Sequence, residues 1–316
     1  MKTMQWLIKR ELWEHKGMLC WAPAVVAAAI SALALLATFV NQNISYNGAM
    51  VTPQNIIVTI EGETRTRIVD TLAHNYVAAA MPVYMVLGFL VFFYCLGALH
   101  DERRDRSILF WKSLPVSDTT TVLSKALMAL VVSPLIVIGI GLAMSLLLLL
   151  AAGVKVALHG TNLFGELLVT PELYLAPLRV LALVPVYFVW ALPTVGWLLM
   201  VSSMARSKVF LWAVGIPVGA GLLLLWAQKA LGFDINAGWV ISHVFNRLLL
   251  GVIPGSWLSF GSLAAAPDIA PAAGLVAFIF EQSWASLAQP AAWLGALAGM
   301  AMLAVAVKMR RRREEG

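Results

Sequence analysis

Long apolar stretches alternate with shorter polar segments along the whole chain. A helix needs about 20 consecutive apolar residues to cross the hydrocarbon core of a bilayer. Five stretches come up to this length, and a sixth, shorter one carries no charge and runs directly into a basic tail. The predicted spans are residues 20–40, 77–99, 126–152, 178–201, 209–227 and 291–307. The pattern therefore predicts an all-α integral membrane protein with six transmembrane helices in a single transmembrane domain, residues 1–316.

Composition narrows the possible functions. Of the 316 residues, 61% are hydrophobic and 12% are charged, whereas a soluble domain has about 45–50% apolar and about 25% charged residues. These values exclude a soluble enzyme, a DNA-binding domain and a disordered chain. The first apolar stretch is longer than the 7–15 residues typical of a signal-peptide core, so we expect it to be a retained transmembrane helix.

The basic residues predict the orientation. Sixteen of the 22 lysines and arginines lie before the first span, between spans two and three, between spans four and five, or after the last span. The other six are Arg65, Arg67, Lys155, Arg179, Lys229 and Arg247. Because lysine and arginine accumulate in cytoplasmic segments, we expect both termini in the cytoplasm.

Three segments outside the spans have distinct patterns. Residues 1–17 carry apolar residues at helical spacing, which favours an amphipathic helix at the membrane interface or a simpler topology anchor. Residues 55–60 are compatible with a short strand. The outer region 230–290 is apolar, yet its segment 271–280, which ends before Glu281, is only about half a bilayer long. We expect re-entrant or interfacial helices there, or a membrane-lying loop that only packs.

Catalytic and cofactor motifs are missing from the sequence. It contains neither a G-x-x-x-x-G-K-[ST] phosphate loop nor an H-E-x-x-H zinc motif. No predicted span carries an acidic residue in its middle, although ion-coupled transporters usually need ionisable groups there. We therefore expect no catalytic, cofactor-binding or metal site in this chain, and no enzyme activity of its own.

One pair of carboxylates supports an alternative function. Asp101 and Asp105 lie four residues apart, so they share a helix face and would be able to bind Mg²⁺ for a diphosphate. This arrangement resembles polytopic membrane prenyltransferases. Such enzymes need a second acidic motif, and the segment 202–208 on the same side has none. Arg103 and Arg104 would also neutralise the pair.

The segment 100–125 has the densest charge between two spans. It begins with the charged run from Asp101 and continues with an amphipathic piece, residues 108–114. Pro115 disfavours a helix in the residue before it. Ser117 or Asp118 is then positioned to cap a new helix that leads into the third span.

This segment resembles the first cytoplasmic loop of ABC-2 type permeases, the membrane subunits of ATP-binding-cassette exporters. Glu102-Arg103 matches the opening of that pattern, Leu114-Pro115-Val116-Ser117 its centre and Lys125 its close. Arg106-Ser107 departs from the Gly-Thr often found there. Residues 8–17 also resemble the N-terminal elbow helix of this family.

The resemblance implies a transport subunit without its own ATPase site in a bacterial cytoplasmic (inner) membrane. Two cytoplasmic ATPase subunits would hydrolyse ATP with Mg, and this chain with a second permease copy or a paralogue would export a hydrophobic or amphipathic substrate. A non-transporting scaffold or sensor subunit is an alternative. No nucleic-acid partner is expected.

The resemblance also implies which residues couple the chain to the ATPase. The charged contacts would be Glu102, Arg103, Arg104 and Asp105, and the buried anchors Phe110, Trp111 and Leu114 with Pro115. The elbow helix would contribute Lys9, Arg10 and Trp13. A solvated stop-transfer cluster is the alternative interpretation of these charges.

Two G-x-x-x-G patterns are candidates for close helix packing. Gly215 and Gly219 lie in the fifth predicted span, and Gly295 and Gly299 in the sixth. Small residues at this spacing let helices approach closely. The sequence leaves open whether these contacts form within one chain or between two copies.

Overall fold

The computed structural model describes residues 2–40, 44–46, 49–51, 62–105, 116–158, 160–232, 236–260 and 274–312. Within these ranges, six helical segments are long and apolar enough to span a membrane. They are Gly17–Thr38, Arg65–Arg104, Asp118–Leu158, Glu172–Met204, Val209–Leu231 and Pro290–Arg312. Each overlaps one predicted span, so the prediction of six helices of membrane-spanning length is confirmed.

The spans are built from consecutive α, π and 3₁₀ segments. The first half of the chain forms α1 Lys2–Glu14, η1 Gly17–Trp21, α2 Ala22–Val40, β1 Ile44–Tyr46, β2 Ala49–Val51, α3 Glu63–Asn75, η2 Tyr76–Ala80, α4 Met81–Ala98, α5 His100–Arg104, α7 Asp118–Leu127, η3 Met128–Val132 and α8 Ser133–Leu158. The second half forms α9 Phe164–Val169, α10 Glu172–Leu181, α11 Val184–Met204, α12 Val209–Leu231, α13 Ala237–Val240, η4 Ile241–Phe245, α14 Asn246–Leu250, α15 Trp257–Phe260, α16 Leu275–Ser286 and α17 Pro290–Arg312.

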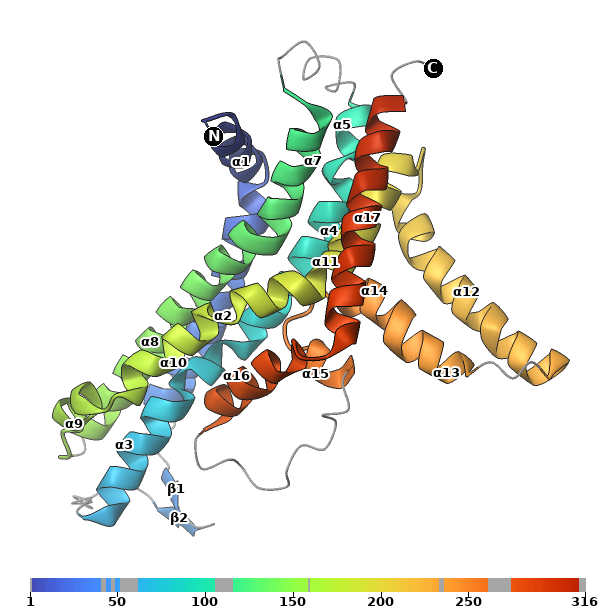
Figure 1. Cartoon of the computed structure of the whole chain (residues 1–316). Coiled ribbons are helices and arrows are strands. Elements are labelled where there is room, and N and C mark those ends of the chain that lie inside the picture. The colour runs from blue at the N-terminus through green and yellow to red at the C-terminus, as the bar shows by residue number, and fades with distance from the viewer. Residues whose placement is uncertain are drawn as a thin grey trace.

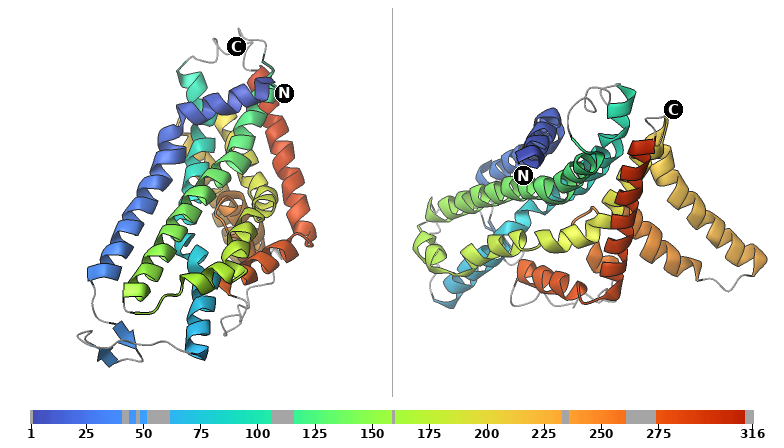
Figure 2. Two further views of the ribbon diagram at one scale, coloured as in Figure 1. Left: turned by 90° about the vertical axis from the view of Figure 1, so that its left-hand side faces the viewer. Right: turned by 45° about the horizontal axis from the view of Figure 1, so that its top comes forward.

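Both ends of the described chain lie at the same end of the helix bundle. Helix α1 and the last turns of α17 are found there with α5 and α7, and α1 lies across the ends of the spanning helices (Figures 1 and 2). We call this the terminal end. Helices α3 and α9 lie at the opposite end with the antiparallel pair β1–β2, in which Ser45 is opposite Met50 (Figure 1). The expected strand at 55–60 lies outside the described residues.

Helix α11 forms the centre of the bundle. Its side chains Val186, Trp190 and Leu198 are almost completely buried, and they belong to one apolar core shared with α4, α7, η3, α8 and α17. Large apolar side chains on the outer helices are instead exposed, for example Leu222 and Trp226 on α12. Exposed apolar surface on this scale suits lipid and not water as the surrounding solvent.

The G-x-x-x-G pattern of the last span packs inside this chain. A Cβ atom built on Gly299 of α17 would lie 2.6 Å from the carbonyl oxygen of Leu192 in α11. One built on Gly196 of α11 would lie 2.5 Å from the carbonyl oxygen of Gly299. The backbones of α11 and α17 therefore touch at these glycines. A Cβ on Gly219 of α12 would meet nothing within 4 Å, and one on Gly215 meets only the nearby Leu211 side chain, 3.9 Å away.

Replacing Gly299 with leucine is expected to destabilise the fold, because backbone atoms cannot move aside as side chains do. Overpacking of this kind costs about 1–3 kcal/mol, and it would appear as a lower melting temperature in detergent. Gly219→Leu is the matched control and should leave the melting temperature unchanged. Equal effects of the two substitutions would contradict the α11–α17 contact.

The outer region folds into short helices. Helices α13, η4 and α14 follow one another over residues 237–250, and α15 and α16 come before the last span. None of the described helices in this region is long enough to span a bilayer, in agreement with the six-span count. Part of the predicted segment 271–280 lies outside the described residues. Helix α16 runs past Glu281, which is exposed, and so extends beyond the expected boundary.

Candidate functional site

The terminal end contains a group of buried charged side chains, which we call the charge cluster. It consists of Arg10 and Glu11 of α1, Glu102 of α5, Asp118 and Lys125 of α7, and Arg310 of α17. The three cations and three carboxylates balance one another. Burying a charge costs several kcal/mol unless it is paired and hydrogen-bonded, so these six residues depend on one another.

Lys125 lies at the centre of the charge cluster. Its Nζ is 2.8 Å from Oε1 of Glu11 and 3.0 Å from Oε1 of Glu102. The side chains of Lys125 and Glu11 are both only 1% exposed. The hydroxyl of Tyr94 in α4 donates to the other oxygen of Glu11 at 3.0 Å. Helices α1, α4, α5 and α7 therefore meet around one ammonium group.

Arg310 joins the last helix to this group. Its Nη1 lies 3.0 Å from Oε2 of Glu102, and its Nε lies 2.9 Å from Oδ1 of Asp118. Arg10 completes the cluster, with Nη2 at 3.3 Å from Oε1 of Glu102. Asp118 is the first residue of α7, where a carboxylate also favours the helix dipole. The N-cap of α7 is Ser117, whose Oγ accepts a hydrogen bond from the Thr120 amide at 3.1 Å. Of the two predicted caps, Ser117 or Asp118, Ser117 is therefore confirmed.

The structure divides the predicted ATPase-coupling residues into two groups. Glu102 and Arg103 turn into the protein: Glu102 enters the charge cluster, while Arg103 donates to the carbonyl oxygens of Ser202 and Ala205 where α11 ends. Arg104 and Asp105 are exposed at the end of α5. The remaining predicted coupling residues, Phe110, Trp111, Leu114 and Pro115, lie outside the described residues.

The residues predicted for the elbow helix are also divided. Lys9 is exposed, and the Trp13 side chain is 63% exposed. Trp6, about two helical turns before Trp13, is 74% exposed. Arg10 belongs to the charge cluster instead. The buried face of α1 carries Leu7 together with Glu11. The predicted apolar stripe therefore packs mainly on the bundle, and the two tryptophans are the apolar side chains left on the outside of α1.

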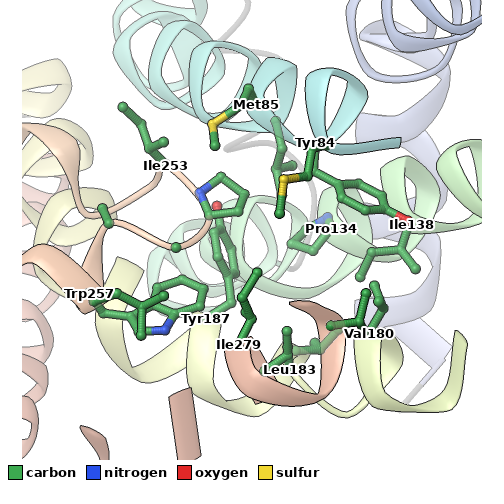
Figure 3. Close-up of a pocket in the computed structure, with 18 of the residues that line it drawn as sticks. Tyr84, Met85, Pro134, Ile138, Val180, Leu183, Tyr187, Ile253, Trp257 and Ile279 are labelled. Atoms are coloured by element: carbon green, nitrogen blue, oxygen red, sulfur yellow. The ribbon is translucent and has the colours of Figure 1, made fainter. Parts of the chain in front are cut away.

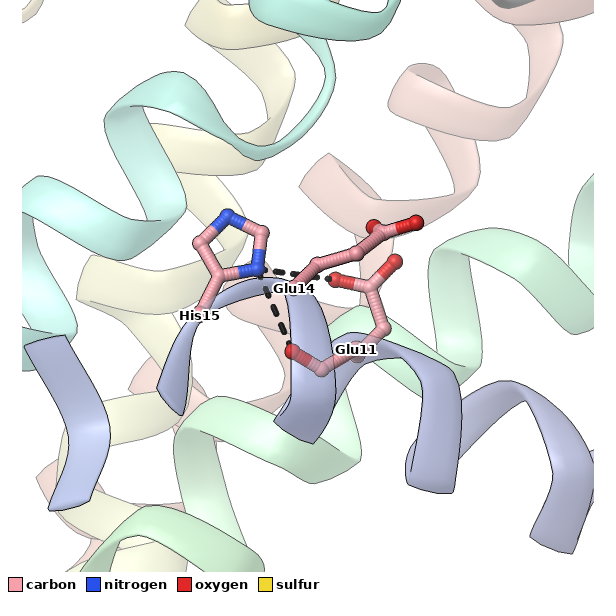
Figure 4. A group of neighbouring side chains, drawn as sticks. All are labelled: Glu11, Glu14 and His15. Carbon is pink, nitrogen blue, oxygen red and sulfur yellow. Dashed lines mark hydrogen bonds and ion pairs between the residues drawn. The ribbon is translucent and has the colours of Figure 1, made fainter. Parts of the chain in front are cut away.

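Glu11, Glu14 and His15 form a group that by its spacing resembles a metal site (Figure 4). Both carboxylate oxygens of Glu11 already have partners, which are Lys125 and the Tyr94 hydroxyl. Glu14 pairs with Arg10 at 3.0 Å. The carboxylates of Glu11 and Glu14 are thus neutralised by Lys125 and Arg10, which argues against a metal ion at this group. Among the described residues, no such group of three includes Asp101 or Asp105.

The half of the bundle away from the termini holds an apolar cavity of about 470 Å³ (Figure 3). Its walls come from η2, α4, α8, α10 and α11 and from the segment 253–259 and α16. Met85, Ile138 and Trp257 are among the side chains that line it. Within the part of the chain that the structure describes, the buried hydroxyls of Tyr84 and Ser256 have no hydrogen-bond partner. The cavity itself is lined almost entirely by apolar surface, which suits a hydrophobic molecule or the apolar part of an amphipathic one.

Arg247 of α14 is a buried cation that the sequence analysis counted among the outer loop residues. It is 7% exposed, and its guanidinium lies 4.3 Å from the ring centroid of Trp190. It donates to the carbonyl oxygens of Ala291 and Ala292 at the start of α17. Desolvation lowers its pKa to about 10, so the group stays charged at neutral pH. Gly295 leaves the space that the guanidinium occupies.

Comparisons with known proteins add no assignment. The chain matches no protein-family model, no curated protein and no solved structure.

Proposed function

We propose that this chain is the membrane subunit of an ATP-binding-cassette exporter, driven by a separate ATPase that docks at the terminal end. One observation carries the proposal. Helices α5 and α7, which lie at the two ends of the predicted docking segment 100–125, are tied to each other and to α1 and α17 by the charge cluster. The first and last residues of the family-like pattern, Glu102 and Lys125, are direct partners at 3.0 Å.

This linkage supports a mechanism for transmitting motion. A load on the docking segment is passed to α1 and α17, because separating the shared carboxylates and cations would leave buried charges unpaired. Arg104 and Asp105, which are exposed, are the charges available to the ATPase. Phe110, Trp111 and Leu114 are the apolar anchors of the docking segment. ATP and Mg are bound by the ATPase and not by this chain.

The opposite half of the bundle suits the passage of the substrate. The apolar cavity lies between α4, α8 and α11 and the short outer helices. A hydrophobic or amphipathic molecule matches its walls. The short helices α13 to α16 form the outer gate, and Arg247 holds α14 against α17 and Trp190. Within this proposal, the exposed face of α12 with Gly215 and Gly219 is available for a second permease subunit.

The proposal requires the terminal end to face the cytoplasm, where ATP is found. In a chain without Cys20 and Cys95, Asp105→Cys should react with a membrane-impermeant maleimide in inside-out vesicles and not in intact cells. Gly165→Cys in α9 is the opposite-end control, since its Cβ would meet nothing within 4 Å, and it should react in intact cells. Labelling of Asp105→Cys from outside would refute the proposal.

A further inference from the structure

A basic pocket of about 460 Å³ opens at the terminal end, between α5 and the turn that joins α11 to α12. Its lining residues are His100, Arg103, Arg104, Ala205, Arg206, Ser207 and Lys208. Four of these residues carry a permanent positive charge, and no lining residue carries a carboxylate. The sequence analysis had used Arg206 and Lys208 only as indicators of orientation.

The walls of this basic pocket are held in place by hydrogen bonds. Arg103 donates to the carbonyl oxygens of Ser202 and Ala205 and so ties α5 to the end of α11. The Ser202 hydroxyl accepts from the amides of Leu99 and His100 at 3.1 and 3.0 Å. Lys208, directly before α12, has φ 50° and ψ 47°, a left-handed conformation that is uncommon outside glycine. The pocket is therefore built by packed backbone and not by a chance meeting of long side chains.

Three of the four cations of the basic pocket are not neutralised within the described residues. No ion pair or hydrogen bond in that part of the chain involves the side chains of Arg104, Arg206 or Lys208. The acid next to the pocket, Asp101, lies 3.1 Å from Nδ1 of His100. Such a concentration of cations attracts an anion, and arginine and lysine are the usual ligands of phosphate groups.

A lipid-facing surface begins directly beside the basic pocket. Phe210, Leu211 and Trp212, at the start of α12, are 53%, 62% and 54% exposed. The chain therefore changes from cationic to exposed apolar residues at Lys208, as expected where a span enters the headgroup layer. Phe92 of α4 contacts the Phe210 ring at a centroid distance of 6.4 Å, so α4 and α12 meet at this surface.

We propose that the basic pocket binds the phosphate group of an anionic phospholipid, whose acyl chains lie against the start of α12. An amphiphile of this kind uses both neighbouring surfaces, the cationic pocket and the exposed apolar side chains. A free phosphate, or an acidic side chain of a protein partner, would use only the first. Basic pockets between spans are known to suit anionic lipid headgroups.

Native mass spectrometry of the full chain, released from detergent micelles, tests this site. Phosphatidylglycerol and phosphatidylcholine are titrated separately against the wild type and the Arg206→Gln/Lys208→Gln variant. We expect phosphatidylglycerol to bind about fivefold more weakly for each charge removed, with no change for phosphatidylcholine. Lys308→Gln/Arg312→Gln, which removes two exposed charges from α17 at the same end, is the matched control and should bind phosphatidylglycerol like the wild type.

Several outcomes would overturn the proposal. These are unchanged phosphatidylglycerol binding in the pocket variant, an equal loss in the control variant, or an equal loss of phosphatidylcholine. Inorganic phosphate is the second arm: if it displaces the lipid at millimolar concentration and binds the lipid-free protein, the pocket serves free phosphate instead. A pocket variant that keeps its lipid and fails to bind an ATPase would assign the pocket to a protein partner.

Discussion

The Lys125→Met substitution is expected to lower the free energy of unfolding by about 3–5 kcal/mol, the usual cost of removing one partner of a buried ion pair. Lys125 is 1% exposed and is the shared cation of Glu11 and Glu102. Without it, the cluster holds three carboxylates and two cations, and Glu11 among them is almost completely buried. The loss would be measured by SDS-induced unfolding or as a lower melting temperature in detergent.

Two further variants separate lost charge balance from lost packing. Glu14→Gln removes a carboxylate from the same helix, but that side chain is 45% exposed, and an exposed pair contributes at most about 1 kcal/mol. In Glu11→Gln/Lys125→Met the remaining two cations and two carboxylates balance again, so we expect the double variant to be more stable than Lys125→Met alone. If the double variant were the less stable of the two, the cluster would not act as a balanced unit.

The Trp111→Ala substitution is expected to weaken binding of the ATPase about 30-fold, because a tryptophan anchor at an interface contributes about 2 kcal/mol or more. The measurement is the dissociation constant between the purified chain in detergent and the ATPase. Trp226→Ala, which removes an exposed tryptophan from α12, is the matched control and should bind like the wild type. The melting temperatures of both variants are measured alongside, so that a loss of binding is distinguished from a loss of the fold.

Unchanged affinity of Trp111→Ala would remove this residue from the proposed interface. A matching loss in Trp226→Ala would mean that the detergent-exposed surface, and not the docking segment, holds the ATPase. The same assay can include a reversal at Asp105, since this side chain is exposed and does not line the basic pocket. Reversals at Glu102 or Arg103 would be unsuitable, because both side chains hold helices of this chain together.

The helices were predictable because their signals are local. Span length and apolar composition depend on consecutive residues, and the Ser117 cap depends on an amide three positions away. A buried ion pair has no such local signal. Arg310 and Glu102 are distant in sequence, and in the sequence Arg310 resembles the other basic residues that follow the last span at the headgroup layer. Glu11 was a local indication of a buried charge, since it lies four residues after Leu7 on an otherwise apolar helix face.

The outer region was harder to predict for the same reason. Arg247 is followed by three leucines, and nothing in that pattern indicates that Trp190 and the start of α17 surround its guanidinium. The packing of the glycines was not predictable from the sequence either. Both G-x-x-x-G patterns look alike in the sequence, yet Gly299 touches the α11 backbone while Gly219 faces open space. Only the packing of the helices distinguishes them.

The central claim is that a separate ATPase drives this chain from the terminal end. The most direct measurement purifies the chain with each ATP-binding-cassette ATPase of its own genome in turn and follows ATP hydrolysis after reconstitution into liposomes. The account predicts that one ATPase forms a stable complex, and that Trp111→Ala lowers its binding and its membrane-dependent hydrolysis while Trp226→Ala does not. If the folded chain binds none of these ATPases, the claim is contradicted.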